Sequence, residues 1–219
     1  MNTKLVPLFL AVALAAPAAN IFYENFDGAT PGFDPTLGVI PGTQFTLVAG
    51  SIDVNGATPP GYYPELCVAP TSGNCIDTTG AAPWGRGTIS TTDAIFFTPG
   101  EYVLSFDLEG WYDTIEGDVT DAWATVQVSL GPLFTPESFT VVGGDQGLVE
   151  QIPFTVVSSN FATLTFSDQE GKYSFAGGIL DNVSIDTVDP PDPPAPEPGT
   201  MLLGGVGALI VFAGKRARQ

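Results

Sequence analysis

Four polar and aromatic side chains on two predicted strands have the chemistry of a sugar site. Asp107 and Glu109 share one face of the first strand, and Trp123 and Gln127 share one face of the second. A hairpin that places Glu109 opposite Trp123 would gather all four on one solvent-facing surface, because side chains alternate across a strand. The indole would stack on a sugar ring while the polar groups bind its hydroxyls. Alternatively, Trp123 packs beneath a loop or at the edge of the sandwich.

Three acidic residues near the predicted first and last strands could bind calcium. Glu24 and Asp181 each have the parity of the apolar residues around them, so inward-facing strands would bury both carboxylates. An unpaired buried charge is costly, and a Ca²⁺ ion between the two strands, with Asp27 as a further ligand, would compensate. The alternatives are that either carboxylate lies in solvent at a strand end or accepts hydrogen bonds from backbone N–H groups.

The residue types present argue against catalysis. The sequence contains no histidine, which excludes Ser-His-Asp and Cys-His catalysis and the usual zinc sites. A glycoside hydrolase or lyase needs only two carboxylates, and Asp107 and Glu109 are the nearest candidates. Two acids on one strand face are common by chance, so we expect no enzymatic activity.

Period-two alternation with turn residues between segments runs through residues 20–188, and no segment has convincing helical periodicity. This pattern predicts an all-β fold, an antiparallel β-sandwich of jelly-roll type. The predicted strands are 21–26, 44–54, 87–97, 101–109, 122–130, 138–142, 152–158, 161–167 and 179–186.

The charge is strongly acidic, with 24 acidic residues against 6 basic ones and a net charge of −18. Only two of the bases, Arg86 and Lys172, lie within residues 20–188. Such a field repels phosphate backbones, which excludes nucleic acid as a partner, and it keeps an exported protein soluble.

Residues 1–19 have the pattern of a secretory signal peptide. Lys4 precedes a short apolar run, and small residues follow it, so we expect cleavage after Ala18 or Ala19. The apolar run is too short for a membrane anchor. In an exported chain, Cys67 and Cys75, the only cysteines, are expected to form a disulfide that pins a surface loop.

The carboxyl end has three parts. Residues 189–195 form a Pro-rich linker that should be extended and semi-rigid. Residues 199–214 are uncharged and mostly apolar, which predicts one transmembrane helix. A basic cluster follows, made of Lys215, Arg216 and Arg218. Such a cluster holds that end of the chain in the cytoplasm and leaves the main domain outside.

Residues 196–219 resemble a known sorting signal. Pro196, Glu197, Pro198 and Gly199, followed by the apolar helix and the basic cluster, are similar to the PEP-CTERM signal of Gram-negative bacteria that make extracellular polysaccharide. The resemblance implies an exosortase-type membrane enzyme as a partner, with cleavage near Pro-Glu-Pro. It also implies an inner-membrane-anchored precursor that faces the periplasm and is later moved to the cell surface or outside.

The domain itself has a second resemblance. Segments 49–54, 75–77, 99–107 and 178–184 are similar to blocks common in PEP-CTERM proteins and, in outline, to jelly-roll carbohydrate-binding modules. This resemblance implies a structural calcium ion that links the first and last strands, and it supplies no catalytic residues.

We therefore expect an exported, non-catalytic surface or matrix protein that binds a glycan or exopolysaccharide. The alternatives are a self-assembling structural protein of the envelope and a glycoside hydrolase or lyase. The ligand should be neutral or basic, since an acidic polysaccharide would need calcium to overcome repulsion.

Overall fold

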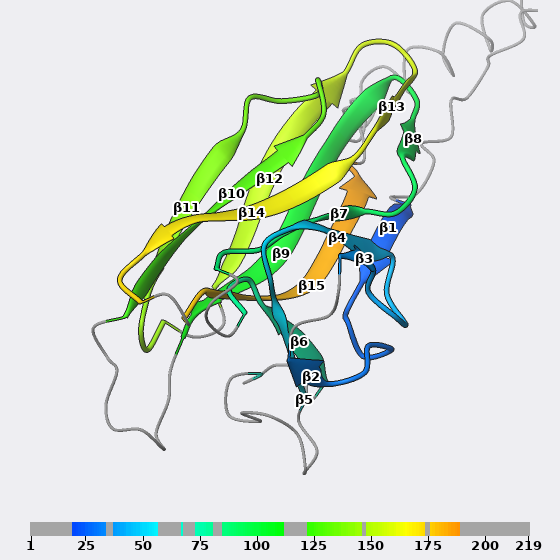
Figure 1. Ribbon diagram of the computed structural model, residues 1–219. Helices are drawn as coiled ribbons and strands as arrows, with labels where there is room; N and C mark the ends of the chain where they lie inside the picture. Colours follow the sequence, from blue (N-terminus) through cyan, green and yellow to red (C-terminus); the bar gives the residue numbers. More distant parts are fainter. Residues whose placement is uncertain are drawn as a thin grey trace, which may run out of the picture. The chain divides into compact units, whose positions relative to one another are not determined.

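The computed structural model describes residues 19–33, 37–56, 67, 73–80, 85–111, 122–145, 148–173 and 176–188. Residues Ala18–Val188 form a compact unit. Within the described ranges the chain forms strands and no helix, and each strand pair is antiparallel (Figure 1). The predicted all-β, antiparallel β-sandwich of jelly-roll type is confirmed.

The larger of the two main sheets, here called sheet A, has β15 near its middle. One edge of β15 pairs with β9. Along its other edge, one part of β15 pairs with β6 and the next part pairs with β1. The order is β12-β9-β15-β6-β5-β2. The strands are β1 (Asn20–Glu24), β2 (Gly32–Phe33), β5 (Asp53–Gly56), β6 (Asn74–Asp77), β9 (Gly100–Gly110), β12 (Val149–Val156) and β15 (Gly178–Thr187).

The second main sheet, sheet B, has the order β11-β10-β14-β7-β4-β3. A separate two-stranded sheet pairs β8 with β13. The strands of sheet B are β3 (Gly38–Val39), β4 (Phe45–Ala49), β7 (Thr88–Thr91), β10 (Trp123–Leu130), β11 (Glu137–Val142) and β14 (Leu164–Gly171), and the small sheet contains β8 (Ile95–Phe97) and β13 (Asn160–Ala162).

The core lies between the inner faces of sheets A and B. Alternation on β9 and β10 buries the predicted apolar faces, and rings from both sheets meet in the middle. The ring of Phe166 on β14 lies 5.2 Å from that of Phe106 on β9 and 6.1 Å from that of Phe45 on β4, measured between centroids. Each fully buried ring of this kind stabilises the fold by about 1.5–3 kcal/mol.

Three predicted strands are each two strands in the structure. The segment 44–54 divides into β4 in sheet B and β5 in sheet A, so the chain crosses between sheets there. Gly50 lies at the crossing with φ +68°, a left-handed conformation that favours glycine. Likewise, 87–97 divides into β7 and β8, and 161–167 divides into β13 and β14.

Three short strands were not predicted: β2, β3 and β6. β6 is covered on both faces, since Cys75, Ile76 and Asp77 are all buried. A strand buried on both faces has no polar–apolar alternation, which is the signal on which the prediction depended.

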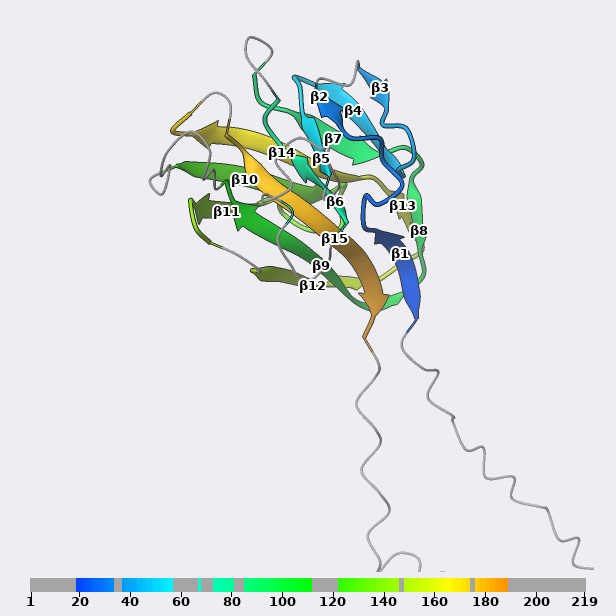
Figure 2. The same cartoon turned by 90° about the horizontal axis from the view of Figure 1, so that it is seen from below.

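The first and last strands of the domain lie side by side (Figure 2). Ala19 N donates to Thr187 Oγ1 at 2.7 Å, and Thr187 N donates to Ala19 O at 2.9 Å. Ala19, one of the two predicted cleavage residues, is therefore hydrogen-bonded to the last strand, while Ala18 lies outside the described residues.

Candidate functional site

The predicted hairpin that would have built the sugar face is wrong. β9 belongs to sheet A, and β10 belongs to sheet B, so Glu109 pairs with Ile179 and Trp123 pairs with Val142. Both strands turn their apolar faces toward the shared core, which leaves Asp107 and Glu109 on the opposite side of the sandwich from Trp123 and Gln127. Alternation identified the core-facing side of each strand correctly but carried no information about the strand it pairs with.

The four residues also differ in exposure. Asp107 and Glu109 are 8% and 7% exposed, and Trp123 and Gln127 are half-buried. Asp107 Oδ2 accepts a hydrogen bond from Asn182 Nδ2 at 2.7 Å. The structure therefore does not bring these side chains together into one binding face.

The predicted calcium ligands do not converge on one ion. Glu24 pairs with Val183 and faces the core, whereas Asp181 pairs with Asp107 on the outer face of sheet A. The prediction that Asp181 points inward is wrong, because a bulge after it inserts one extra residue and reverses the alternation. Asn182, at this bulge, has φ +49°.

The oxygens of Glu24 follow one of the alternatives to calcium. Oε1 accepts the N–H of Phe26 at 2.8 Å, and Oε2 accepts that of Gln44 at 2.7 Å. Asp27 is exposed, and its Oδ1 accepts the N–H of Asn74 at 3.0 Å. Among the described residues, no three acidic or cysteine side chains come together around a metal position. Glu24, Asp27 and Asp181 thus do not fit a shared calcium site, and calcium binding as such stays a prediction.

The predicted disulfide is confirmed, since Cys67 and Cys75 are bonded. It belongs to a second apolar cluster on the outer face of sheet A, where Trp111 is 6% exposed. Ile179, on β15, belongs to the same cluster. The disulfide therefore ties Cys67 to β6 within this cluster.

The two bases of residues 20–188, Arg86 and Lys172, each contact nearby groups. Arg86 Nη1 lies 2.6 Å from Asp168 Oδ1, and its Nη2 donates to Gly171 O at 3.0 Å. The ammonium of Lys172 lies 5.1 Å from the ring centroid of Tyr173. The buried Asp168 carboxylate is thus neutralised locally, where an unpaired charge would be strongly destabilising.

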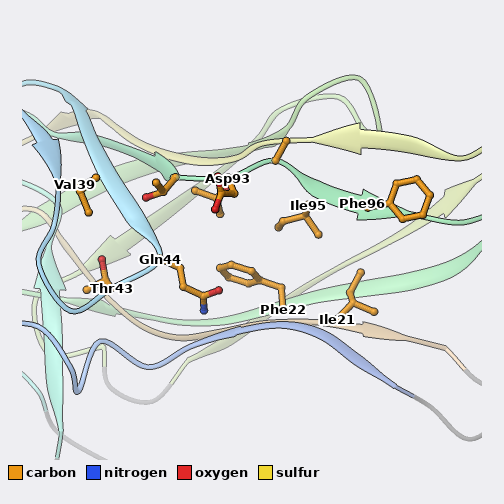
Figure 3. A pocket seen from close by; sticks show the side chains of 11 residues that line it. Ile21, Phe22, Val39, Thr43, Gln44, Asp93, Ile95 and Phe96 are labelled. Atoms are coloured by element: carbon orange, nitrogen blue, oxygen red, sulfur yellow. The ribbon is translucent and has the colours of Figure 1, made fainter.

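A pocket of about 520 Å³ opens beside β1, between β3 and the segment that joins β7 to β8 (Figure 3). Pockets of ~300–1,000 Å³ are typical of small-molecule sites. Ile21, Phe22 and Ile95 supply apolar surface, while Gln44 and Asp93 supply polar groups. An apolar surface with a few placed polar groups can bind a sugar through its C–H face and its hydroxyls.

The sequence folds this way locally because Glu24 fixes the neighbouring turns. Its two carboxylate oxygens hold the backbone of Phe26, which has φ +55°, and that of Gln44 at the rim of the pocket. Gln44 Nε2 in turn donates to Tyr23 O. The carboxylate predicted to bind calcium therefore positions one wall of the pocket.

An exposed aromatic pair adjoins the pocket. Phe96, which lines the pocket, is 51% exposed, and Phe161, opposite it on β13, is 63% exposed. Their ring centroids lie 4.9 Å apart. The prediction missed this pair, although the adjacent Phe96 and Phe97 carried a signal: on a strand, neighbouring side chains point to opposite faces, so one ring had to be outside.

The sorting residues lie outside the described part of the chain. These are Pro196, Glu197, Pro198, Gly199, Lys215, Arg216 and Arg218, and the predicted linker, the predicted transmembrane helix and residues 1–18 of the predicted signal peptide also lie outside it. The ranges that the structure describes contain no helix with the length and apolar character of a membrane span.

The family model of the PEP-CTERM protein-sorting motif matches residues 194–218. The chain therefore carries a PEP-CTERM sorting motif at its carboxyl end, which is the signal of an exported protein that is membrane-anchored and then processed. No curated protein matches the chain.

Several solved structures are similar in fold. The CBM22-1 xylan-binding domain of Xyn10C from Paenibacillus barcinonensis is 12% identical, with a TM-score of 0.46 over 81% of this chain and 99% of that one. The K3 cleaved adhesin domain of Lys-gingipain from Porphyromonas gingivalis is 14% identical, with a TM-score of 0.45 over 78% and 100%. The C-terminal CBM6 of LamC from Zobellia galactanivorans is 15% identical, with a TM-score of 0.35 over 63% and 88%. At these identities the likeness concerns the fold alone.

Proposed function

We propose that this chain is an exported, non-catalytic surface or extracellular-matrix protein that binds a glycan in the pocket beside β1. The observation that carries the proposal is the pocket itself, which combines apolar surface, an exposed phenylalanine and placed polar groups. The sorting motif supports it, because it is the signal of an exported protein.

The composition of the pocket favours binding over hydrolysis. Asp93 is the only acid among the described residues that line the pocket, whereas glycoside hydrolysis by the usual routes needs two carboxyl groups flanking the bond. Asp107 and Glu109, the pair that could have served, are buried on the outer face of sheet A, and neither lines the pocket.

Binding of the purified full-length chain, in detergent, to a panel of neutral, basic and acidic polysaccharides tests the proposal. The panel should include the extracellular polysaccharide of the producing bacterium. Replacing Phe96 with Ala removes the exposed ring at the pocket, and it should weaken binding by about tenfold or more, which is ~1.4 kcal/mol.

Tyr23→Ala is the matched control, because Tyr23 is an equally exposed aromatic residue on β1 that does not line the pocket. It should leave affinity unchanged. Absence of binding across the panel, or equal losses in the two variants, would refute glycan binding at this site. Concentration-dependent assembly in light scattering without any glycan would then favour a self-assembling structural protein.

A further inference from the structure

The exposed aromatic surface continues past the edge of the pocket. Phe161 is the direct cross-strand partner of Phe96, so the two rings share one face of the β8–β13 sheet. The opposite face is turned to the core, since Phe97 is fully buried and Ala162 is 4% exposed. Phe97 and Ala162 thus attach the small sheet to the core, while the rings of Phe96 and Phe161 are left exposed on its other face.

The charge at the pocket is negative. Asp93 is exposed, and among the described residues that line the pocket it is the only titratable side chain, with no lysine or arginine beside it. The bases of the domain are held elsewhere, Arg86 by Asp168 and Lys172 over Tyr173. With a net charge of −18, the chain attracts cations and repels carboxylated or sulfated sugars.

We infer that the pocket and the Phe96–Phe161 pair bind an extended glycan chain whose sugars carry protonated amino groups. This inference rests on the proposed glycan-binding function and names the ligand class of the same site. One part of the chain occupies the pocket, where Asp93 meets an ammonium group, and the next sugar stacks on Phe161.

Two features of binding follow from this arrangement. Affinity should rise with chain length until the ligand reaches Phe161, because the second ring adds a separate stacking position. An exposed carboxylate–ammonium pair should favour an amino sugar by about twofold to fivefold, and salt should weaken that preference.

The test is calorimetric titration of the purified full-length chain with matched oligomers of one to six sugars. One series is β-1,4-linked glucosamine, held at a pH below the pKa of its amine, and the other is its N-acetylated counterpart. We expect tighter binding of the glucosamine series at low ionic strength, with a gain in affinity from the dimer to the tetramer.

Two variants assign these effects to residues. Asp93→Asn should remove the preference for glucosamine, while Glu170→Gln, the loss of an exposed carboxylate outside the pocket, should leave it intact. Phe161→Ala should weaken binding of the tetramer but not that of the dimer.

Equal affinity for the two series, or an unchanged preference in Asp93→Asn, would overturn the amino-sugar inference. Equal weakening of dimer and tetramer by Phe161→Ala would overturn the extended site. If other glycans still bind in a Phe96-dependent way, only this inference fails. If no glycan binds, the proposed function fails with it.

Discussion

At the scale of single residues, Asp77 is a deeply buried acid, at 2% exposure. Its Oδ1 accepts the N–H groups of Thr79 at 2.9 Å and Gly177 at 3.0 Å. Burial raises the pKa of Asp77 well above its ordinary value, and the nearby charge of Asp53 raises it further. The folded protein therefore binds this proton more tightly than the unfolded chain does.

This shift predicts how stability depends on pH. A raised pKa in the folded state gives stability that is fully present below the unfolded pKa of about 3.9 and is lost as pH rises through the folded value. Burial also raises the pKa of Asp168, so its contribution has the same sign. Asp77→Asn keeps an oxygen acceptor for both N–H groups but removes the titrating carboxyl group. We therefore expect the melting temperature of this variant to fall less between pH 4 and pH 8 than that of the wild type.

The exposed Glu170 supplies the control for that measurement. Glu170→Gln should reproduce the wild-type profile of melting temperature against pH. A slope in Asp77→Asn as steep as that of the wild type would show that Asp77 does not titrate differently on folding.

Asn55 allows a second prediction at this scale. It is 1% exposed, and neither its Nδ2 nor its Oδ1 has a hydrogen-bond partner in the part of the chain that the structure describes. Since an unsatisfied buried amide is costly, Asn55→Leu should raise the free energy of unfolding by about 1–2 kcal/mol in urea denaturation. Asn74→Leu is the contrast, because Asn74 Nδ2 donates to Ala29 O at 2.9 Å and its loss should destabilise. A less stable Asn55→Leu protein would contradict the prediction.

At the scale of elements, periodicity predicted the faces of strands better than their partners. The apolar faces of β9 and β10 are those that alternation indicated, yet the strands belong to different sheets. Local irregularities decided the rest. A bulge at Asn182 turned Asp181 away from the core, and a left-handed residue at Gly50 divided one predicted strand into two. The alternation of polar and apolar residues predicts neither a bulge nor a left-handed residue.

The crossing at Gly50 can be tested with a graded set of alanines. An alanine at position 50 would have to adopt φ +68°, and its Cβ would lie 1.8 Å from Arg86 O. Gly85 has φ +78° with open space around its Cβ position, and Gly32 has open space without a positive φ. We expect a loss near zero for Gly32→Ala, about 1–2 kcal/mol for Gly85→Ala, and about 2–5 kcal/mol for Gly50→Ala.

Urea denaturation of the three variants measures the unfolding free energies. Their order matters more than their size, because it separates backbone strain from the clash with the Arg86 carbonyl. If Gly50→Ala were no less stable than Gly85→Ala, the close approach of the two segments at the crossing would be wrong.

At the scale of the whole molecule, the sorting signal was easier to predict than the binding pocket. The sorting motif is one continuous segment, so its residues could be read in order, and the family match covers residues 194–218. The pocket draws on β1, β3 and the β7–β8 segment, which lie far apart in sequence and meet only when their partner strands are known. Phe96 was the one lining residue with a local signal, its place beside Phe97 on a strand.

Separation of the tail from the domain predicts that sorting and folding can be altered independently. Residues Ala18–Val188 form their own compact unit, and Glu197 lies outside it. Glu197→Ala removes the acid at the centre of Pro-Glu-Pro, so a processing enzyme that reads this motif should leave the precursor uncleaved in the membrane fraction.

Intact-mass analysis should find wild-type protein without residues 1–18 or 1–19 and without the segment after the motif, and the variant still ending at Gln219. The melting temperature of the domain should be the same in both, because no described contact is lost. A wild-type chain that keeps Gln219, or a variant processed normally, would refute processing at this motif.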